Sequence, residues 1–128
     1  MAGTNRYGIG MYQRVLAVGS TPFERISTMY LGSLRITKQG LKAVNSGEVA
    51  YAEEKAEKLH AIVQRLDQSL DYDIAPELCQ NLSKLYGHIM ARLSDVTIGT
   101  DPAIFEEIHS LLNTLWVGFQ EAHARTSP

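Results

Sequence analysis

Cysteine is almost absent from this 128-residue chain, which contains only Cys79. A single cysteine excludes a disulfide within the chain and is typical of proteins from a reducing compartment. No apolar run approaches the roughly 20 residues of a membrane span, and the first ten residues, MAGTNRYGIG, lack the apolar stretch of a secretory signal. We therefore expect a cytoplasmic protein without membrane insertion, in which Cys79 is a small core or groove residue rather than a nucleophile.

An excess of charge of either sign is also missing. The chain has 12 lysine and arginine residues against 14 aspartate and glutamate residues, a formal net charge of −2 at pH 7. A basic patch of the kind that drives binding to phosphate backbones is not evident in the sequence. We therefore expect neither a nucleic acid nor an anionic membrane as a partner.

Proline is scarce, and three of the four prolines fall where helices would begin. Thr21 before Pro22, and Asp101 before Pro102, are typical of a capping residue followed by a first-turn proline, and Gly47 is a stop signal. These signals predict four helices, over about 21–45, 48–69, 76–95 and 101–123. Because no segment has strand periodicity, we expect one all-α domain, an antiparallel four-helix bundle at 20–123, with an N-terminal arm at 1–19 and a flexible tail at 124–128.

The spacing of apolar residues predicts which side of each helix faces the core. A spacing of three and four residues indicates one buried face of an α-helix. The second predicted helix has this pattern at Ala52, Ala56, Leu59, Val63, Leu66 and Leu70, and the third has it at Leu78, Leu82, Leu85, Ile89 and Leu93. We expect both sets to face inward.

Other apolar residues lie off the core-facing line when residues are placed at 100° steps around each helix. They are Met29 and Ile36 (with the small Ser33 and Gly40) in the first helix, Tyr86 and Met90 in the third, and Trp116 and Val117 in the last. The mixture of medium and small side chains in the first helix predicts a shallow groove. Either the helices have broad core faces, or these residues bind a helix or extended peptide from a partner; the spacing leaves both interpretations open.

Two Glu-x-x-His sequences, Glu57 to His60 and Glu106 to His109, suggest a dinuclear metal site in a helical bundle. Both glutamates are expected to point away from the core, so we expect no metal site. A histidine phosphotransfer domain is the alternative function, with His60 or His88 as the phosphorylated residue. Neither histidine has the neighbours typical of that class. No nucleophile–base set or phosphate-binding loop is recognisable, so we expect a protein that is not an enzyme and needs no cofactor.

A series of short segments runs in order from Ile9 to Phe119. They are IGMY from Ile9, STP from Ser20, MYLGSL from Met29, AVNSGE from Ala43, LHAIVQRLDQSLD from Leu59, EL from Glu77 with NLSKLY from Asn81, and LNTLW from Leu112. Together they resemble the FliS family of flagellar secretion chaperones, and the segment at 77–86 is the most specific. Three residues depart from the family pattern: Leu31 and Glu48 replace aspartates, and Cys79 stands where a small residue is common.

The resemblance implies a cytoplasmic chaperone of flagellin. Such a protein binds the disordered C-terminal segment of flagellin one to one, blocks its premature polymerisation and delivers it to the flagellar type III export gate. Whether the free protein is a monomer or a weak homodimer stays open. Resemblance and spacing together give the expected partner-binding residues: Ile9, Tyr12, Met29, Ile36, Asn81, Leu82, Tyr86, Met90 and Trp116.

The N-terminal arm carries apolar residues between glycines. Ile9 and Tyr12 are three residues apart, on a segment with Gly8, Gly10 and Gly19. We expect Ile9 and Tyr12 to cover an apolar groove of the bundle in the free protein and to yield it when the client arrives. A permanently packed segment is the alternative.

Overall fold

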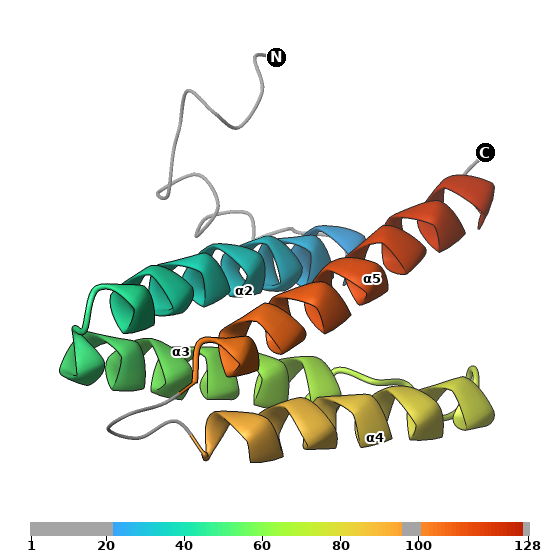
Figure 1. Cartoon of the computed structure of the whole chain (residues 1–128). Coiled ribbons are helices and arrows are strands. Elements are labelled where there is room, and N and C mark those ends of the chain that lie inside the picture. Colours follow the sequence, from blue (N-terminus) through green and yellow to red (C-terminus); the bar gives the residue numbers. More distant parts are fainter. Residues whose placement is uncertain (1–21, 96–100, 127–128) are drawn as a thin grey trace.

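The computed structural model describes residues 22–95 and 101–126 of the chain. Within these ranges the chain forms α2 (Pro22–Asn45), α3 (Val49–Gln68), α4 (Pro76–Leu93) and α5 (Ala103–Thr126), and successive helices run in opposite directions (Figure 1). The predicted all-α class with helices packed against one another is confirmed. The expected arm at 1–19, including Ile9 and Tyr12, lies outside the described residues. The last helix continues to Thr126, beyond the domain boundary expected near residue 123.

Local hydrogen bonds explain two of the helix ends. Gly47 has a φ of 75°, and the Glu48 N–H donates to the Ala43 carbonyl at 2.8 Å while the Gly47 N–H donates to the Val44 carbonyl at 3.1 Å. This is the Schellman arrangement that ends a helix at a glycine. At the start of α5, the Ala103 N–H donates to the Asp101 carboxylate at 2.9 Å, as expected for a capping aspartate.

The core is built from one apolar line of each helix, as the spacing predicted for α3. Its buried members are Tyr30, Ile36 and Ala43 of α2, Ala52, Ala56, Leu59, Val63 and Leu66 of α3, Tyr86, Ile89 and Leu93 of α4, and Ile104, Phe105, Ile108 and Leu112 of α5. The prediction for α4 is wrong at two positions. Leu78 is 57% exposed and Leu85 is 37% exposed, because the surface of α4 that carries them is not covered by α5.

The α2 line that was expected to form a shallow groove is instead part of the interior. Ser33 and Ile36 are buried, and Gly40 lies so close to the Phe105 ring of α5 that a Cβ atom there would overlap it. Small residues at a helix crossing allow the two backbones to approach. The groove prediction for this line is therefore wrong, because the line is covered by packing against the bundle.

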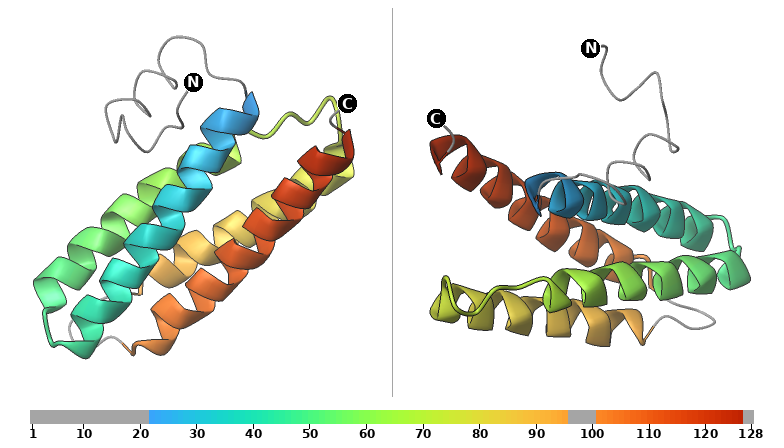
Figure 2. Two further views of the ribbon diagram at one scale, coloured as in Figure 1. Left: turned by 90° about the horizontal axis from the view of Figure 1, so that it is seen from above. Right: turned by 180° about the vertical axis from the view of Figure 1, so that it is seen from behind.

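The close approach of α2 and α5 at Gly40 and Phe105 explains how α5 is placed. The N-terminal half of α5 holds its fully buried residues, Phe105, Ile108 and Leu112. Beyond Leu112, the helix packs on α2 and diverges from α4, so that its C-terminal end stands away from the start of α4 (Figures 1 and 2). The bundle is thus closed at one end and open between α4 and α5 at the other.

Candidate functional site: an apolar groove between α4 and α5

The divergence of α4 and α5 leaves a groove with a volume of about 560 Å³. Leu78, Cys79, Leu82 and Tyr86 line it from α4, and Thr114, Leu115, Gly118, Phe119 and Ala122 line it from α5. Ile26, Tyr30 and Leu66 lie across its floor, and Ser69, Leu70, Asp71, Ile74 and Ala75 lie at one end. Asp71 is the only charged residue among these lining residues, so the groove presents an almost wholly apolar surface.

Two buried tyrosines meet in the floor of the groove. The hydroxyl oxygens of Tyr30 and Tyr86 lie 2.6 Å apart and share a hydrogen bond, and both side chains are buried. Burial raises the pKa of the Tyr30 phenol; burial and the neighbouring Tyr30 raise the pKa of the Tyr86 phenol. Both phenols therefore stay neutral near pH 7, and their polar atoms satisfy each other.

The segment between α3 and α4 forms the open end of the groove. The Asp73 N–H donates to the Asp71 carboxylate at 3.1 Å, and the Cys79 thiol donates to the Asp71 carbonyl at 3.4 Å. These bonds fix the turn that carries Ile74, which is 80% exposed. Ile74 and Leu78 thus offer apolar surface at the mouth, where it is not needed for the core.

A charged cluster joins α4 to α5 at the closed end of the bundle. His88 Nε2 lies 2.9 Å from Glu107 Oε2, and Arg92 Nη2 lies 3.3 Å from Glu107 Oε1. The hydrogen bond from His88, with Arg92 nearby, lowers the pKa of the Glu107 carboxyl. We call these three residues the clasp, because they hold the two helices together where the apolar groove ends.

Aromatic side chains hold the C-terminal half of α5 against α2. The Phe23 ring stacks on His123 at 3.6 Å between centroids and on Phe119 at 5.3 Å. The Tyr30 ring lies 5.8 Å from Trp116 and 5.9 Å from Phe119. This half of α5 is therefore supported by α2, which leaves the side toward α4 free to form a wall of the groove.

The expected partner-binding residues fall into separate places. Leu82 and Tyr86 line the groove, although Tyr86 is only 3% exposed. Asn81 is exposed on α4, one residue before Leu82. The others lie elsewhere: Met29, Met90 and Trp116 are half-buried against the core and Ile36 is inside it, while Ile9 and Tyr12 are outside the described residues.

Sequence reasoning missed most of the groove. Leu78 was assigned to the core by its spacing, whereas it lines the groove, and Ile26 and Phe119 line the groove without having been expected there. The available signal was the break after Leu70, because Ile74 is an apolar residue between two helices and so belongs to no predicted core face.

The residues considered for catalysis do not converge in the described part of the chain. No group of three or more histidine, cysteine, aspartate or glutamate side chains that would hold a metal ion occurs in residues 22–95 and 101–126. His60 is half-buried on α3, and the His88 ring bonds to Glu107. No helix among these residues is long and apolar enough to cross a membrane.

The comparison with family models assigns a family. The model described as flagellar protein FliS matches residues 4–126 of the chain. No curated protein sequence matches it. Since the matched range covers nearly the whole chain, including all four helices around the groove, the chain belongs to the FliS family of flagellar proteins.

Proposed function

We propose that this protein is a chaperone that binds the disordered C-terminal segment of flagellin in the groove between α4 and α5. Membership of the FliS family implies a flagellar chaperone role. The observation that supports the finer assignment is the groove itself, which has a volume of about 560 Å³ and is lined almost wholly by apolar residues among those described. Contiguous apolar surface of this kind marks sites of interaction in soluble proteins.

The groove suits a helix better than a strand. Its long walls are two helices whose backbone groups bond within each helix, so they offer no edge to which a strand would add. A helical client satisfies its own backbone and offers apolar side chains at intervals of three and four residues. From Leu78 to Tyr86 the α4 wall runs for about 12 Å, roughly two helical turns, so the groove would hold one short amphipathic segment of the client.

Binding in this way accounts for the chaperone role. Apolar side chains of flagellin that would otherwise pack between filament subunits would be buried against Leu82, Leu115 and Phe119. Premature polymerisation would thereby be blocked. Ordering a disordered segment has an entropic cost, which keeps the complex releasable. We propose a one-to-one complex formed in the cytoplasm and handed to the flagellar export gate.

The test uses a synthetic peptide from the C-terminal region of the flagellin of the same host. Wild-type protein is expected to bind it one to one with a gain of peptide helicity in circular dichroism. L78D should bind at least about tenfold more weakly, since it places a charge at the apolar mouth. The matched control is V117D, at an α5 position that is also exposed (43%) but does not line the groove.

Two results would contradict the proposal. One is the absence of a stoichiometric complex with the wild-type protein. The other is equal weakening by L78D and V117D, which would place the client elsewhere on the surface. A histidine phosphotransfer role is not favoured, because the family is one of chaperones and the His88 ring is engaged by Glu107.

A further inference from the structure

The outer face of α2 carries three cations and one leucine at helical spacing. Leu31, Arg35, Lys38 and Lys42 follow one another at intervals of four, three and four residues, and all four are exposed. At 100° per residue they lie within about 60° of one another, over a length of roughly 16 Å. We call these four residues the basic stripe. It is not evident from the composition, because the net charge of the whole chain is −2.

Among the residues that the structure describes, no ion pair neutralises the cations of the basic stripe. From Arg25 to Asn45 the sequence of α2 contains no acidic residue. Two cations elsewhere do have partners: Lys58 pairs with Glu54, and Arg92 pairs with Glu107 and Asp95. Within the described ranges, the ion pairs involve none of the three cations of the stripe.

A small pocket adjoins the stripe at the seam between α2 and α5. It has a volume of about 230 Å³ and is lined by Thr37, Lys38, Leu41, Glu106 and His109. Burial, together with the positive field of Lys38, lowers the pKa of His109, so the field of this cation is felt on the neighbouring helix although Glu106 lines the same pocket. Leu41 supplies apolar surface beside the charges.

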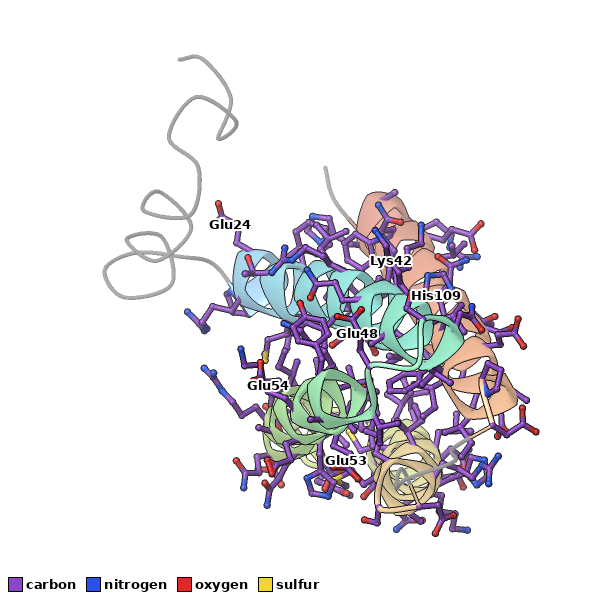
Figure 3. All side chains as sticks on the ribbon, turned by 60° about the vertical axis from the view of Figure 1, so that its left-hand side comes forward. Glu24, Lys42, Glu48, Glu53, Glu54 and His109 are labelled. Carbon is purple, nitrogen blue, oxygen red and sulfur yellow. The ribbon has the colours of Figure 1, made fainter. Side chains whose placement is uncertain are left out.

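The glutamates of α3 lie on another side of the molecule. Figure 3 shows Lys42 and His109 on the side formed by α2 and α5, and Glu53 and Glu54 on α3. A second copy would have to place its α3 on the α2 of the first copy. Because the two faces point in different directions, such a contact would not close into a dimer but would continue into an open chain. A second copy therefore fits this surface poorly.

We propose that the basic stripe and its adjoining pocket form a docking surface for an acidic amphipathic helix of a protein other than the client. Carboxylates at the same helical spacing would face Arg35, Lys38 and Lys42, and one apolar side chain would enter the pocket beside Leu41. Charge complementarity of this kind supplies orientation and a fast encounter more than affinity. Three cations over about 10 Å, in a chain of negative net charge, fit such a helix better than the extended phosphate array of a nucleic acid or a membrane.

This surface is separate from the groove between α4 and α5. His109 of α5 lies at the stripe, whereas Thr114 and Gly118 of the same helix line the groove. The two surfaces are on different sides of α5, so a client helix and the acidic partner would bind at the same time. The stripe would thus allow a second protein to recognise the loaded chaperone.

The test uses a synthetic 16-residue helical peptide with glutamates at positions 1, 5, 8 and 12 and two leucines on the adjoining face. Its control replaces each glutamate with glutamine. We expect saturable binding of the glutamate peptide only, weakened by added salt. The triple variant R35Q/K38Q/K42Q should bind about tenfold more weakly, while K58Q/R65Q/K84Q, which removes the same charge from exposed positions elsewhere, should bind like the wild type.

Three results would overturn the inference. These are equal binding of both peptides, equal loss in both triple variants, and stripe-dependent binding of a 20-mer oligonucleotide or of anionic vesicles that exceeds binding of the peptide. The flagellin peptide is added in a separate arm. If R35Q/K38Q/K42Q still binds the flagellin peptide normally, then its weaker binding of the glutamate peptide reports on the basic stripe alone and not on the groove.

Discussion

The hydroxyls of Tyr30 and Tyr86 lie 2.6 Å apart and join α2 to α4 across the floor of the groove. Both rings are also part of the core. The pair therefore links the packing of the bundle to the shape of its binding surface. It places two polar atoms beneath an apolar groove without leaving either of them unsatisfied.

The Y86F variant tests this pairing. It keeps the ring and removes one hydroxyl, so the buried Tyr30 hydroxyl loses its partner. We expect a loss of about 1–3 kcal/mol in the free energy of unfolding, measured by urea denaturation, whereas the double variant Y30F/Y86F should recover most of it. A double variant less stable than Y86F would show that the two hydroxyls are stabilised by other contacts.

The same pair predicts a dependence of stability on alkaline pH. The folded protein raises the pKa of both phenols above the ordinary value of about 10. The unfolded chain therefore loses these protons at a lower pH than the folded chain. The contribution of the two neutral phenols to the stability of the fold is complete below about pH 10. It is lost as the pH rises toward the pKa values of the phenols in the folded protein. Between pH 9 and 11, melting temperatures should fall more steeply in the wild type than in Y30F/Y86F; parallel curves would contradict the assignment.

The clasp predicts a dependence on acid pH with the opposite sign. Because the Glu107 pKa is lowered from its ordinary value of 4.5, its contribution is present above about pH 4.5 and is lost as the pH falls through the folded value. The stability difference between wild type and E107Q should therefore be present above about pH 4.5 and shrink toward pH 3. It should also shrink with added salt, since the clasp is partly exposed. The control is E57Q, which removes an exposed carboxylate of α3; it should leave stability almost unchanged at every pH.

The helices themselves follow from local sequence, which explains why they were predicted. Gly47 and Asp101 end and begin helices through bonds within a few residues, and the α3 stripe repeats without interruption. Such signals depend on neighbours in the chain and are readable without knowledge of the fold.

The groove, in contrast, depends on contacts between distant segments. Its opening follows from the divergence of α5 from α4, which depends on the approach of Phe105 to Gly40. Periodicity assigned Leu78 to the core because it identifies an apolar face but not the helix that covers it. Leu82 and Tyr86 were predicted because the family resemblance, and not the spacing alone, drew attention to residues 77–86.

The crossing of α2 and α5 gives the last prediction. A Cβ atom at Gly40 would overlap the Phe105 ring, so G40A should force the helices apart and lower the free energy of unfolding by about 1–3 kcal/mol. Gly32 is the matched control on the same helix, because a Cβ there meets nothing within 4 Å. G32A should instead stabilise the protein by roughly 0.5–1 kcal/mol through helix propensity. Since G40A displaces a wall of the groove, it should also weaken binding of the flagellin peptide, measured by calorimetry, whereas G32A should not. Equal stability of G40A and G32A would show that α5 is not positioned by this contact.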